Sequence, residues 1–394
     1  MIPPGPTFSS RVPADLRPNR LTSALARLRA SGAVIADLTE TNPTRAGIEY
    51  PESVLDALAS RAGLAYEPQP FGLAAAREAV AADYGRRGLV VDPARIALTA
   101  STSEAYSLLF KLLCDPGDEV LVPRPSYPLF DHLTALDAVA ARPYRLDAQF
   151  GWSVDLDSVA NAITPRTRAV LAVSPNNPTG SFLDNTEIDA LARLCAERGL
   201  AFVADEVFAD YVLDARAAAG PCVLARPDAL TFSLGGLSKS AGLPQVKLGW
   251  IAAGGPEGLV ASAMARLEII CDSYLSVSTP VQHAAHALLE AGAAIRGRIR
   301  ARAAGNYRRL SSLASAHPAC TLLPARGGWS AVLRVPATRP EEQLVLSLLE
   351  EDHVLVHPGY FFDFAAEAFV VVSLLPDPAV FDRGAAALLA RASQ

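Results

Sequence analysis

The sequence has few cysteines and no surplus of basic residues. No pair of cysteines has the spacing of metal ligands, and an odd number does not suggest a framework of disulfides; they are Cys114, Cys195, Cys222, Cys271 and Cys320. This pattern favours a reducing compartment and predicts no metal site. The formal net charge of −6 argues against nucleic acid as a partner.

Long apolar stretches are also missing. No run of about eighteen or more uninterrupted apolar residues occurs, so the sequence predicts no transmembrane helix and no membrane partner. Residues 1–7 lack the basic start and the apolar core of a signal peptide. Together with the cysteine pattern, these absences lead us to expect a cytoplasmic protein.

Apolar residues are nevertheless plentiful, at 51% of the 394 residues against 19% for charged residues. This composition is typical of a globular protein, and the chain is too long for one simple core. We therefore expect more than one domain.

From about residue 95, apolar runs of strand length alternate with helical segments such as Ser103–Cys114 and Asp184–Arg198. Near-continuous apolar strands separated by helices indicate an α/β fold, with a mostly parallel seven-stranded sheet covered by helices. The expected strands are Arg95–Thr99, Glu119–Val122, Ala140–Leu146, Ala169–Val173, Ala201–Ala204, Ala229–Leu234 and Leu248–Ala253.

The C-terminal part of the chain has a different pattern. One long helix is expected over residues 279–307, followed by strands of a smaller sheet in Gly327–Val335 and Phe369–Leu375. These elements predict a smaller α+β domain. The expected division is an N-terminal arm with part of the small domain over 1–45, a large domain over 46–278 and a small C-terminal domain over 279–394.

Polar residues follow several predicted strands, and catalytic residues of such sheets gather where the strands end. Ser101 and Thr102 open a helix, where they either cap it or bind phosphate. Tyr127, in a proline-rich turn, either packs there or stacks on a flat ring. Asn177 can donate its amide hydrogen to a ring oxygen. Asp205 ends an apolar strand, where a carboxylate needs a partner such as a protonated pyridine nitrogen.

Lys239 lies just after an apolar strand, close to Gly235 and Gly236. A lysine in a loop is usually an exposed surface residue. A lysine at the end of a buried strand can instead form a Schiff base, because its surroundings keep the amine neutral and orient it. The neighbouring loops favour the second interpretation.

These features occur in a fixed order along the chain, from the phosphate loop and the stacking tyrosine to Asn176-Asn177-Pro178-Thr179-Gly180, Asp205-Glu206 and Gly236-Leu237-Ser238-Lys239. The set resembles the fold-type-I enzymes that use pyridoxal 5′-phosphate, and most closely the class I/II aminotransferases (aspartate and alanine aminotransferase relatives). The resemblance covers nearly the whole chain, from Leu38 to Leu375.

The resemblance implies an aminotransferase that moves an amino group between an amino acid and a 2-oxo acid, with pyridoxal 5′-phosphate held by Lys239 as an internal aldimine. Lys239 would also serve as the acid and base of the proton shift. Asp205 would pair with the ring nitrogen, Asn177 would donate to the ring oxygen O3′, and Tyr127 would stack on the ring.

The same resemblance assigns the phosphate group to Ser101, Thr102 and Ser238, with Lys247 as the cation. It also implies that Tyr66 reaches the phosphate bound by a neighbouring subunit. We therefore expect a homodimer, which is also the commonest closed assembly.

Two cofactor positions depart from the family's usual pattern. Lys247 stands in place of an arginine and lacks its bidentate geometry. Phe208 stands in place of a tyrosine that also donates to O3′. Because this hydrogen bond is missing, we expect the cofactor's visible band to titrate at a different pH than in relatives with tyrosine.

A third departure concerns the substrate. Val371 stands where most relatives have the arginine that binds the α-carboxylate, and no arginine lies within residues 368–375. Arg326 and Arg124 are candidates for this role, although either could be an ordinary solvated loop arginine.

The missing arginine also keeps an alternative open, another pyridoxal-phosphate enzyme on the same scaffold, such as a β- or γ-eliminating lyase or a decarboxylating enzyme. A binding or regulatory protein is disfavoured because Lys239 and Asp205 are both present and the N-terminal arm is short.

Overall fold

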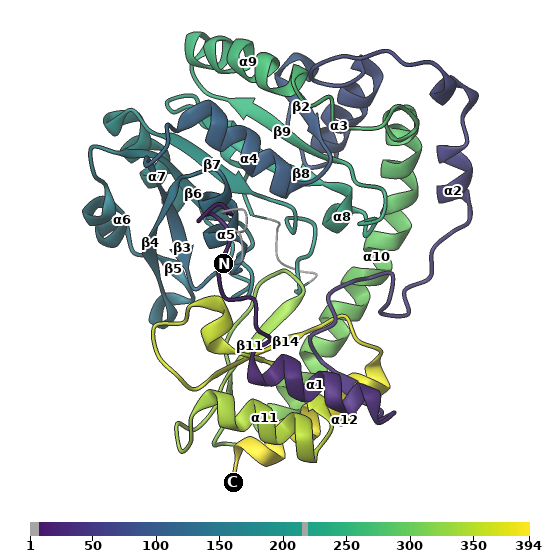
Figure 1. The fold of residues 1–394 in the computed structure, drawn as a ribbon, viewed down its shortest axis with the longest axis vertical. Coiled ribbons are helices and arrows are strands. Elements are labelled where there is room, and N and C mark those ends of the chain that lie inside the picture. The colour runs from purple at the N-terminus through teal and green to yellow at the C-terminus, as the bar shows by residue number, and fades with distance from the viewer. Residues whose placement is uncertain (1–7, 215–219) are drawn as a thin grey trace, which may run out of the picture.

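The computed structural model describes residues 8–214 and 220–394, so the first seven positions of the predicted N-terminal arm lie outside the described residues. The chain forms a large eight-stranded sheet, a small four-stranded sheet and a two-stranded one. Helices pack around both larger sheets (Figure 1). No helix in the described ranges is long and apolar enough to cross a membrane.

The large sheet contains all seven predicted strands, in the order β2-β9-β8-β7-β6-β3-β4-β5. The extra strand, β5, has only two residues and pairs antiparallel with the end of β4. Strand β9 also runs antiparallel to its neighbours β2 and β8. The strands from β8 through β7, β6 and β3 to β4 are all parallel, which confirms the mostly parallel α/β sheet. The strands are β2 Ile96–Thr99, β3 Glu119–Arg124, β4 Ala140–Asp147, β5 Ser153–Val154, β6 Thr167–Val173, β7 Ala201–Asp205, β8 Thr231–Gly236 and β9 Gly249–Gly254.

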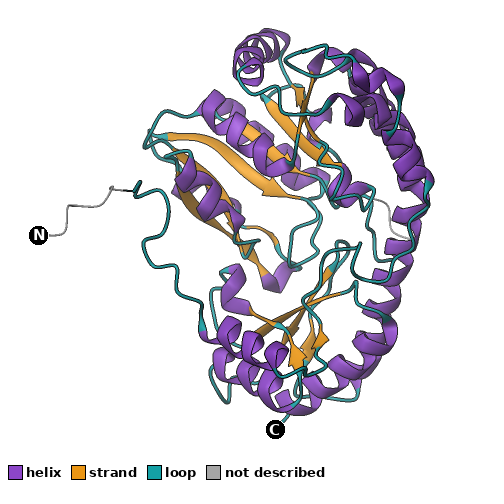
Figure 2. Ribbon diagram, turned by 45° about the vertical axis from the view of Figure 1, so that its right-hand side comes forward, coloured by secondary structure: helices purple, strands orange, loops and turns teal. Residues whose placement is uncertain are grey.

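Apolar side chains project from both faces of this sheet, as expected of parallel strands between helices. Val120, Leu171 and Val203 pack with helices α4 and α9, whereas Leu121 and Phe202 pack on the other face with α7. Figure 2 shows the strands between these helical layers. The helices are α2 Ser53–Leu58, α3 Ala74–Arg86, α4 Thr102–Leu113, α5 Leu129–Leu136, α6 Leu156–Ala162, α7 Asn185–Arg198, α8 Leu237–Ser240 and α9 Glu257–Asp272.

The small sheet is antiparallel and has the order β10-β11-β14-β13. Helices α1, α11 and α12 pack with it in one apolar core, and β1 pairs with β12. The N-terminal segment therefore joins this C-terminal unit. The elements are α1 Arg20–Ala30, β1 Ala36–Asp37, β10 Thr321–Leu322, β11 Ser330–Arg334, α11 Glu341–Glu351, β12 Val354–Leu355, β13 His357–Pro358, β14 Phe369–Ser373 and α12 Pro378–Ala392.

One long helix, α10 (Thr279–Ser315), runs beside both sheets (Figure 1). It contacts α2 and α3 of the large unit and α12 of the small unit. The helix extends eight residues beyond the predicted 279–307, because residues 308–315 continue its apolar face with Leu310 and Ala314, which are buried.

Candidate active site

Three strands bring their polar loops to one edge of the large sheet. Gly249, which begins β9, is paired with Thr99 at the end of β2 and with Gly236 at the end of β8. A Cβ at position 249 would lie 3.0 Å from Thr99 Oγ1 and 3.2 Å from the carbonyl oxygen of Gly235, so glycine permits this close approach. The loops that follow β2 and β8 and precede β9 are therefore neighbours.

Lys239 lies in α8, a single helical turn where the sequence suggested a plain turn. Its Nζ lies 5.6 Å from the ring centroid of Phe208 and 5.1 Å from that of Trp329. Nζ makes no hydrogen bond or ion pair with the residues that the structure describes. Burial lowers the pKa of Lys239, and the negative charge of Asp205 opposes this shift. The amine therefore has the environment that a nucleophilic lysine requires.

A side-chain hydrogen bond holds the backbone carbonyl group of Lys239. Tyr211 donates its hydroxyl hydrogen to the carbonyl oxygen of Lys239 over 2.5 Å. The rings of Phe208, Tyr211 and Trp329 contact one another at centroid distances between 4.9 and 6.5 Å, each pair edge to face. A rigid aromatic wall thus lines one side of the lysine.

Asp205 ends β7, next to Val173 of β6 and Leu234 of β8. Its carboxylate accepts a hydrogen bond from the backbone N–H of Val207 at 3.1 Å and one from the hydroxyl of Tyr106 at 3.2 Å. Burial raises the pKa of Asp205 to about 6, and these two donors only partly oppose the rise. A cationic partner would stabilise the negative charge of this buried carboxylate.

Asn177 connects the two sheets. Ser330 of β11 donates its hydroxyl hydrogen to Oδ1 of Asn177 over 3.1 Å. Since Oδ1 is occupied by this donor, the amide nitrogen of Asn177 is the group left to serve a ligand. The neighbouring Asn176 has a structural role, because its buried amide donates to Pro125 and Thr179.

The predicted phosphate residues come from the three neighbouring loops. Ser101 caps α4, and its Oγ accepts a hydrogen bond from the backbone N–H of Glu104 at 3.2 Å. Thr102 opens the same helix, and its methyl carbon lies 3.9 Å from the place of a Cβ on Gly236. Ser238 follows β8 in α8, and Lys247 precedes β9 with an exposed side chain. A helix N-terminus with hydroxyl groups and a lysine in an adjacent loop suits an anion.

Arg124 ends β3, and Tyr127 lies in the loop that follows. The ring of Tyr127 is half exposed. The guanidinium of Arg124 lies 3.5 Å from Asp131 and 3.5 Å from Asp363, so two carboxylates already share its charge.

Arg326 lies in the segment before β11. Its backbone N–H donates to the carbonyl oxygen of Gly180 at 2.9 Å, and its guanidinium carbon lies 5.6 Å from the ring centroid of Phe182. No carboxylate in the described ranges forms an ion pair with it.

Val371 is buried in β14, opposite Val332 of β11 and His357 of β13. Together with Phe362, these valines form a small apolar cluster. An apolar cluster therefore occupies the place that the resemblance assigns to a carboxylate-binding arginine.

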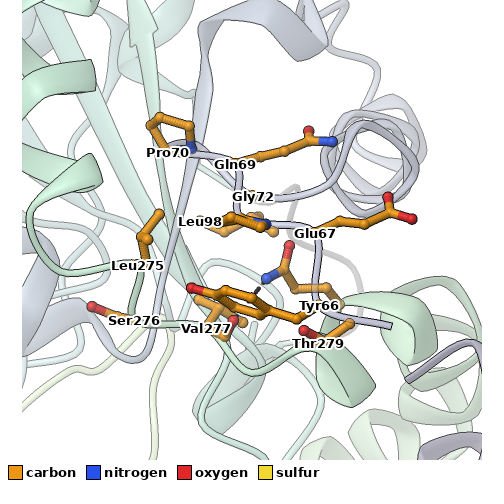
Figure 3. A pocket seen from close by; sticks show the side chains of 12 residues that line it. Tyr66, Glu67, Gln69, Pro70, Gly72, Leu98, Leu275, Ser276, Val277 and Thr279 are labelled. Atoms are coloured by element: carbon orange, nitrogen blue, oxygen red, sulfur yellow. Dashed lines mark hydrogen bonds between the residues drawn. The ribbon is translucent and has the colours of Figure 1, made fainter. Parts of the chain in front are cut away.

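Tyr66 is 72% exposed and lies away from the aromatic wall of Lys239. Figure 3 shows its ring in the wall of a small surface pocket, with Leu275, Ser276 and Val277. Within one chain, the structure does not bring Tyr66 to the other predicted cofactor residues.

Sequence reasoning missed Tyr106, Tyr211, Trp329 and Ser330. Tyr106 had a usable signal, because it lies one helical turn beyond Thr102 on a helix that opens at the site. Trp329 and Ser330 follow Gly327-Gly328, a glycine pair that marks a close approach of chains; a Cβ at position 327 would lie 2.7 Å from the carbonyl oxygen of Tyr211.

Comparison with known proteins gives consistent matches. The model of the family described as aminotransferase class I and II matches residues 37–388. The glutamate-pyruvate aminotransferase AlaA of Escherichia coli K12 is 28% identical over 357 residues, which cover 88% of each chain. The alanine aminotransferase of Mycobacterium tuberculosis H37Rv is 28% identical over 372 residues, covering 89% of this chain and 84% of the relative. A solved aminotransferase structure from Escherichia coli superposes with a TM-score of 0.86 at 25% identity, covering 98% of both chains.

Proposed function

Because this chain belongs to the class I and II aminotransferases, and is thus a transaminase that transfers an amino group, we propose that it works with pyridoxal 5′-phosphate bound through Lys239. The observation that carries this proposal is the amine of Lys239, which lies beside two aromatic rings, lacks a hydrogen-bond partner among the described residues and has a lowered pKa. Such an amine is poised to attack an aldehyde.

The residues present fit this cofactor. Asp205 has a carboxylate whose two donors leave its pKa raised, and a protonated pyridine nitrogen would supply the missing positive charge. Asn177 would donate its amide to the ring oxygen O3′, and Tyr127 would cover the ring. Ser101, Thr102 and Ser238 would hold the phosphate group at the N-terminus of α4, with Lys247 as the cation.

When bound, the cofactor supplies an electron-accepting ring that stabilises the charge left as the substrate loses its α-proton. Lys239 would hold and move that proton, because a primary amine can serve as both acid and base. Asp205 would keep the ring nitrogen protonated through its negative charge. The rings of Phe208 and Trp329 would lie beside the lysine amine.

We propose small molecules as the reaction partners, namely an amino acid and a 2-oxo acid. The two relatives are named glutamate-pyruvate aminotransferase and alanine aminotransferase, so alanine, glutamate and pyruvate are the first compounds to test as substrates. The alternative of an eliminating or decarboxylating enzyme rests on the missing arginine at Val371. It is the weaker reading because the family and both relatives are aminotransferases.

A half-reaction tests the proposal and separates it from the alternative. The loaded protein is mixed with single amino donors and no oxo acid. An aminotransferase converts its cofactor to pyridoxamine 5′-phosphate in stoichiometric amounts and releases the oxo acid. A lyase would instead release ammonia catalytically, and a decarboxylating enzyme carbon dioxide; either result would replace the proposed activity. The Lys239→Ala variant must lose the visible band of the bound cofactor.

We further propose that the enzyme is a cytoplasmic homodimer without a nucleic-acid partner. All five cysteines are free thiols, and four of them are buried, which suits a reducing compartment. The exposed position of Tyr66 at a surface pocket supports a dimer in which it serves the neighbouring subunit. Division into a large unit over 46–278 and a small unit formed by 1–45 and 279–394 agrees with the pairing of β1 and β12.

A further inference from the structure

The indole nitrogen of Trp329 is a buried hydrogen-bond donor without a partner in the described part of the chain. The residue is only 2% exposed, so bulk solvent does not reach it. Leaving a buried N–H unpaired destabilises the folded state, and native proteins rarely keep such groups without a reason. The donor is therefore expected to serve a bound group.

Two other buried polar atoms lack partners in the described ranges, and neither lies at the site. Thr231 begins β8, at the end of the strand opposite to Lys239. Asn306 lies in α10, where its amide nitrogen already donates to the carbonyl oxygens of Leu374 and Pro376. Trp329 differs from both because its ring packs against the amine of Lys239, at 5.1 Å from the centroid to Nζ.

The surroundings of Trp329 point to one kind of ligand atom. Its ring meets that of Phe208 edge to face at 5.2 Å, and Phe208 has no polar atom to offer. The next residue, Ser330, orients the amide of Asn177. Trp329 thus contacts Phe208 and the amine of Lys239, and it directly precedes the residue that bonds Asn177. Lys239, Phe208 and Asn177 are the three residues around the expected place of the cofactor's ring oxygen. That oxygen is bonded to the ring carbon next to the one that carries the aldehyde.

We propose that Trp329 donates its indole N–H to the ring oxygen O3′ of bound pyridoxal 5′-phosphate, beside Asn177 and in place of the hydroxyl that Phe208 lacks. The assignment rests on the proposed function, because it needs the cofactor at Lys239. It makes Trp329 a cofactor-binding residue and explains how the site tolerates phenylalanine at position 208.

The proposal predicts a spectroscopic effect with a definite sign. A donor to the ring oxygen stabilises its negative charge most when the nitrogen that joins Lys239 to the cofactor is unprotonated, since no neighbouring positive charge then shares it. The indole N–H therefore lowers the pKa of that nitrogen. Removing the N–H should raise this pKa by about one unit, because hydrogen bonds to charged groups are worth roughly 1.5–3 kcal/mol.

The test compares visible spectra of the loaded wild type and variants across pH, without substrate. Trp329→Phe keeps an aromatic ring but removes the N–H, and its visible band should titrate about one unit higher. Trp152→Phe is the matched control, because Trp152 packs on Phe364 and Phe369 and should titrate as the wild type does. The double variant Phe208→Tyr/Trp329→Phe regains a hydroxyl donor, so its titration should move back toward the wild type.

A second measurement needs no variant. The chain has three tryptophans, so the indole N–H signals can be followed in protein labelled with ¹⁵N-tryptophan. Adding pyridoxal 5′-phosphate should move the Trp329 proton strongly downfield. The Trp250 proton, which already binds the hydroxyl of Tyr84 at 3.2 Å, should stay in place.

Several results would overturn the assignment. In the titrations, these results are an unchanged pKa in Trp329→Phe, an equal shift in Trp152→Phe, or a double variant that titrates like Trp329→Phe. In the NMR experiment, the contrary result is a Trp329 indole signal that does not move when the cofactor is added. If Trp329→Phe titrates normally but loses kcat/KM for amino acids and not for the matched amines without a carboxylate, the donor serves the substrate instead. A wild type that binds no cofactor would refute the proposed function itself, whereas normal transamination without these shifts would refute the inference alone.

Discussion

Ser330 donates its hydroxyl hydrogen to Oδ1 of Asn177 over 3.1 Å, and this bond joins the small sheet to the edge of the large sheet where we propose that the cofactor binds. The bond fixes which end of the Asn177 amide faces the site, so that the nitrogen remains free to donate. Ser330 is therefore a positioning residue, since it acts through Asn177.

We predict that Ser330→Ala weakens binding of pyridoxal 5′-phosphate about fivefold, because a neutral hydrogen bond is worth about 1 kcal/mol. Fluorescence titration of the cofactor-free protein measures the dissociation constant. Ser373→Ala is the control: Ser373 is paired with Ser330 across the strands, but its hydroxyl donates to the carbonyl oxygen of Glu40. Equal weakening in both variants would show that the small sheet, and not the Asn177 bond, causes the effect.

Asp205 should make the stability of the cofactor-free protein depend on pH. Its folded pKa of about 6 lies above the ordinary value of 3.8, so the folded state binds the proton more tightly than the unfolded state between these values. Stability therefore falls as pH rises through this window, and the full cost is present above pH 6. Asp205→Asn should remove a cost of up to about 3 kcal/mol at pH 8.

Urea denaturation of both proteins between pH 4 and pH 8 checks this prediction. The gain from Asp205→Asn should shrink toward zero as the pH falls to about 4. The variant should bind pyridoxal 5′-phosphate more weakly, because the ring nitrogen loses its counter-charge. Asp228→Asn serves as control, since Asp228 is exposed. A gain that is the same at every pH would show that packing, and not titration of the carboxyl group, is responsible.

The strands of the large sheet could be predicted from the sequence, because parallel strands that are covered on both faces are apolar runs, as in Val170-Leu171-Ala172-Val173. It missed β5, since two residues carry no pattern, and it ended α10 too early at residue 307. Lys239, Asp205 and Asn177 could be predicted as site residues because each lies at or just after the end of a buried strand, within a short motif. Short segments of sequence are therefore enough to identify these residues as candidates.

The supporting residues are not local. Tyr106 reaches Asp205 across 99 positions, and Ser330 reaches Asn177 across 153. Nothing in either segment alone specifies these pairs, because the parallel order of the strands and the packing of the small sheet create them. The same holds for Trp329, whose role depends on an aromatic wall built from separate elements. These supporting residues are therefore determined by tertiary packing and cannot be predicted from short motifs.

The two arginine candidates should behave differently in kinetics. Arg124 already faces Asp131 and Asp363, whereas Arg326 stacks over Phe182 without an ion pair in the described residues. We expect Arg326→Ala to raise KM for amino donors about tenfold or more, as for the loss of a charged hydrogen bond, and Arg124→Ala to leave it within about twofold. The measurement is the half-reaction with each donor. If neither variant changes KM, no arginine of this pair binds the carboxylate.

Tyr66 decides whether the site needs a second chain. In a mixed dimer of Lys239→Ala and Tyr66→Phe subunits, one site would combine an intact Lys239 with an intact Tyr66 only if the tyrosine crosses the subunit boundary. We expect the isolated mixed dimer to bind one cofactor with wild-type affinity, while Tyr66→Phe dimers bind it more weakly. Pairing Lys239→Ala with Tyr274→Phe, another exposed tyrosine, gives the reference for one intact site. A mixed dimer no better than Tyr66→Phe would place Tyr66 in its own subunit, and a monomer in sedimentation would remove the shared site altogether.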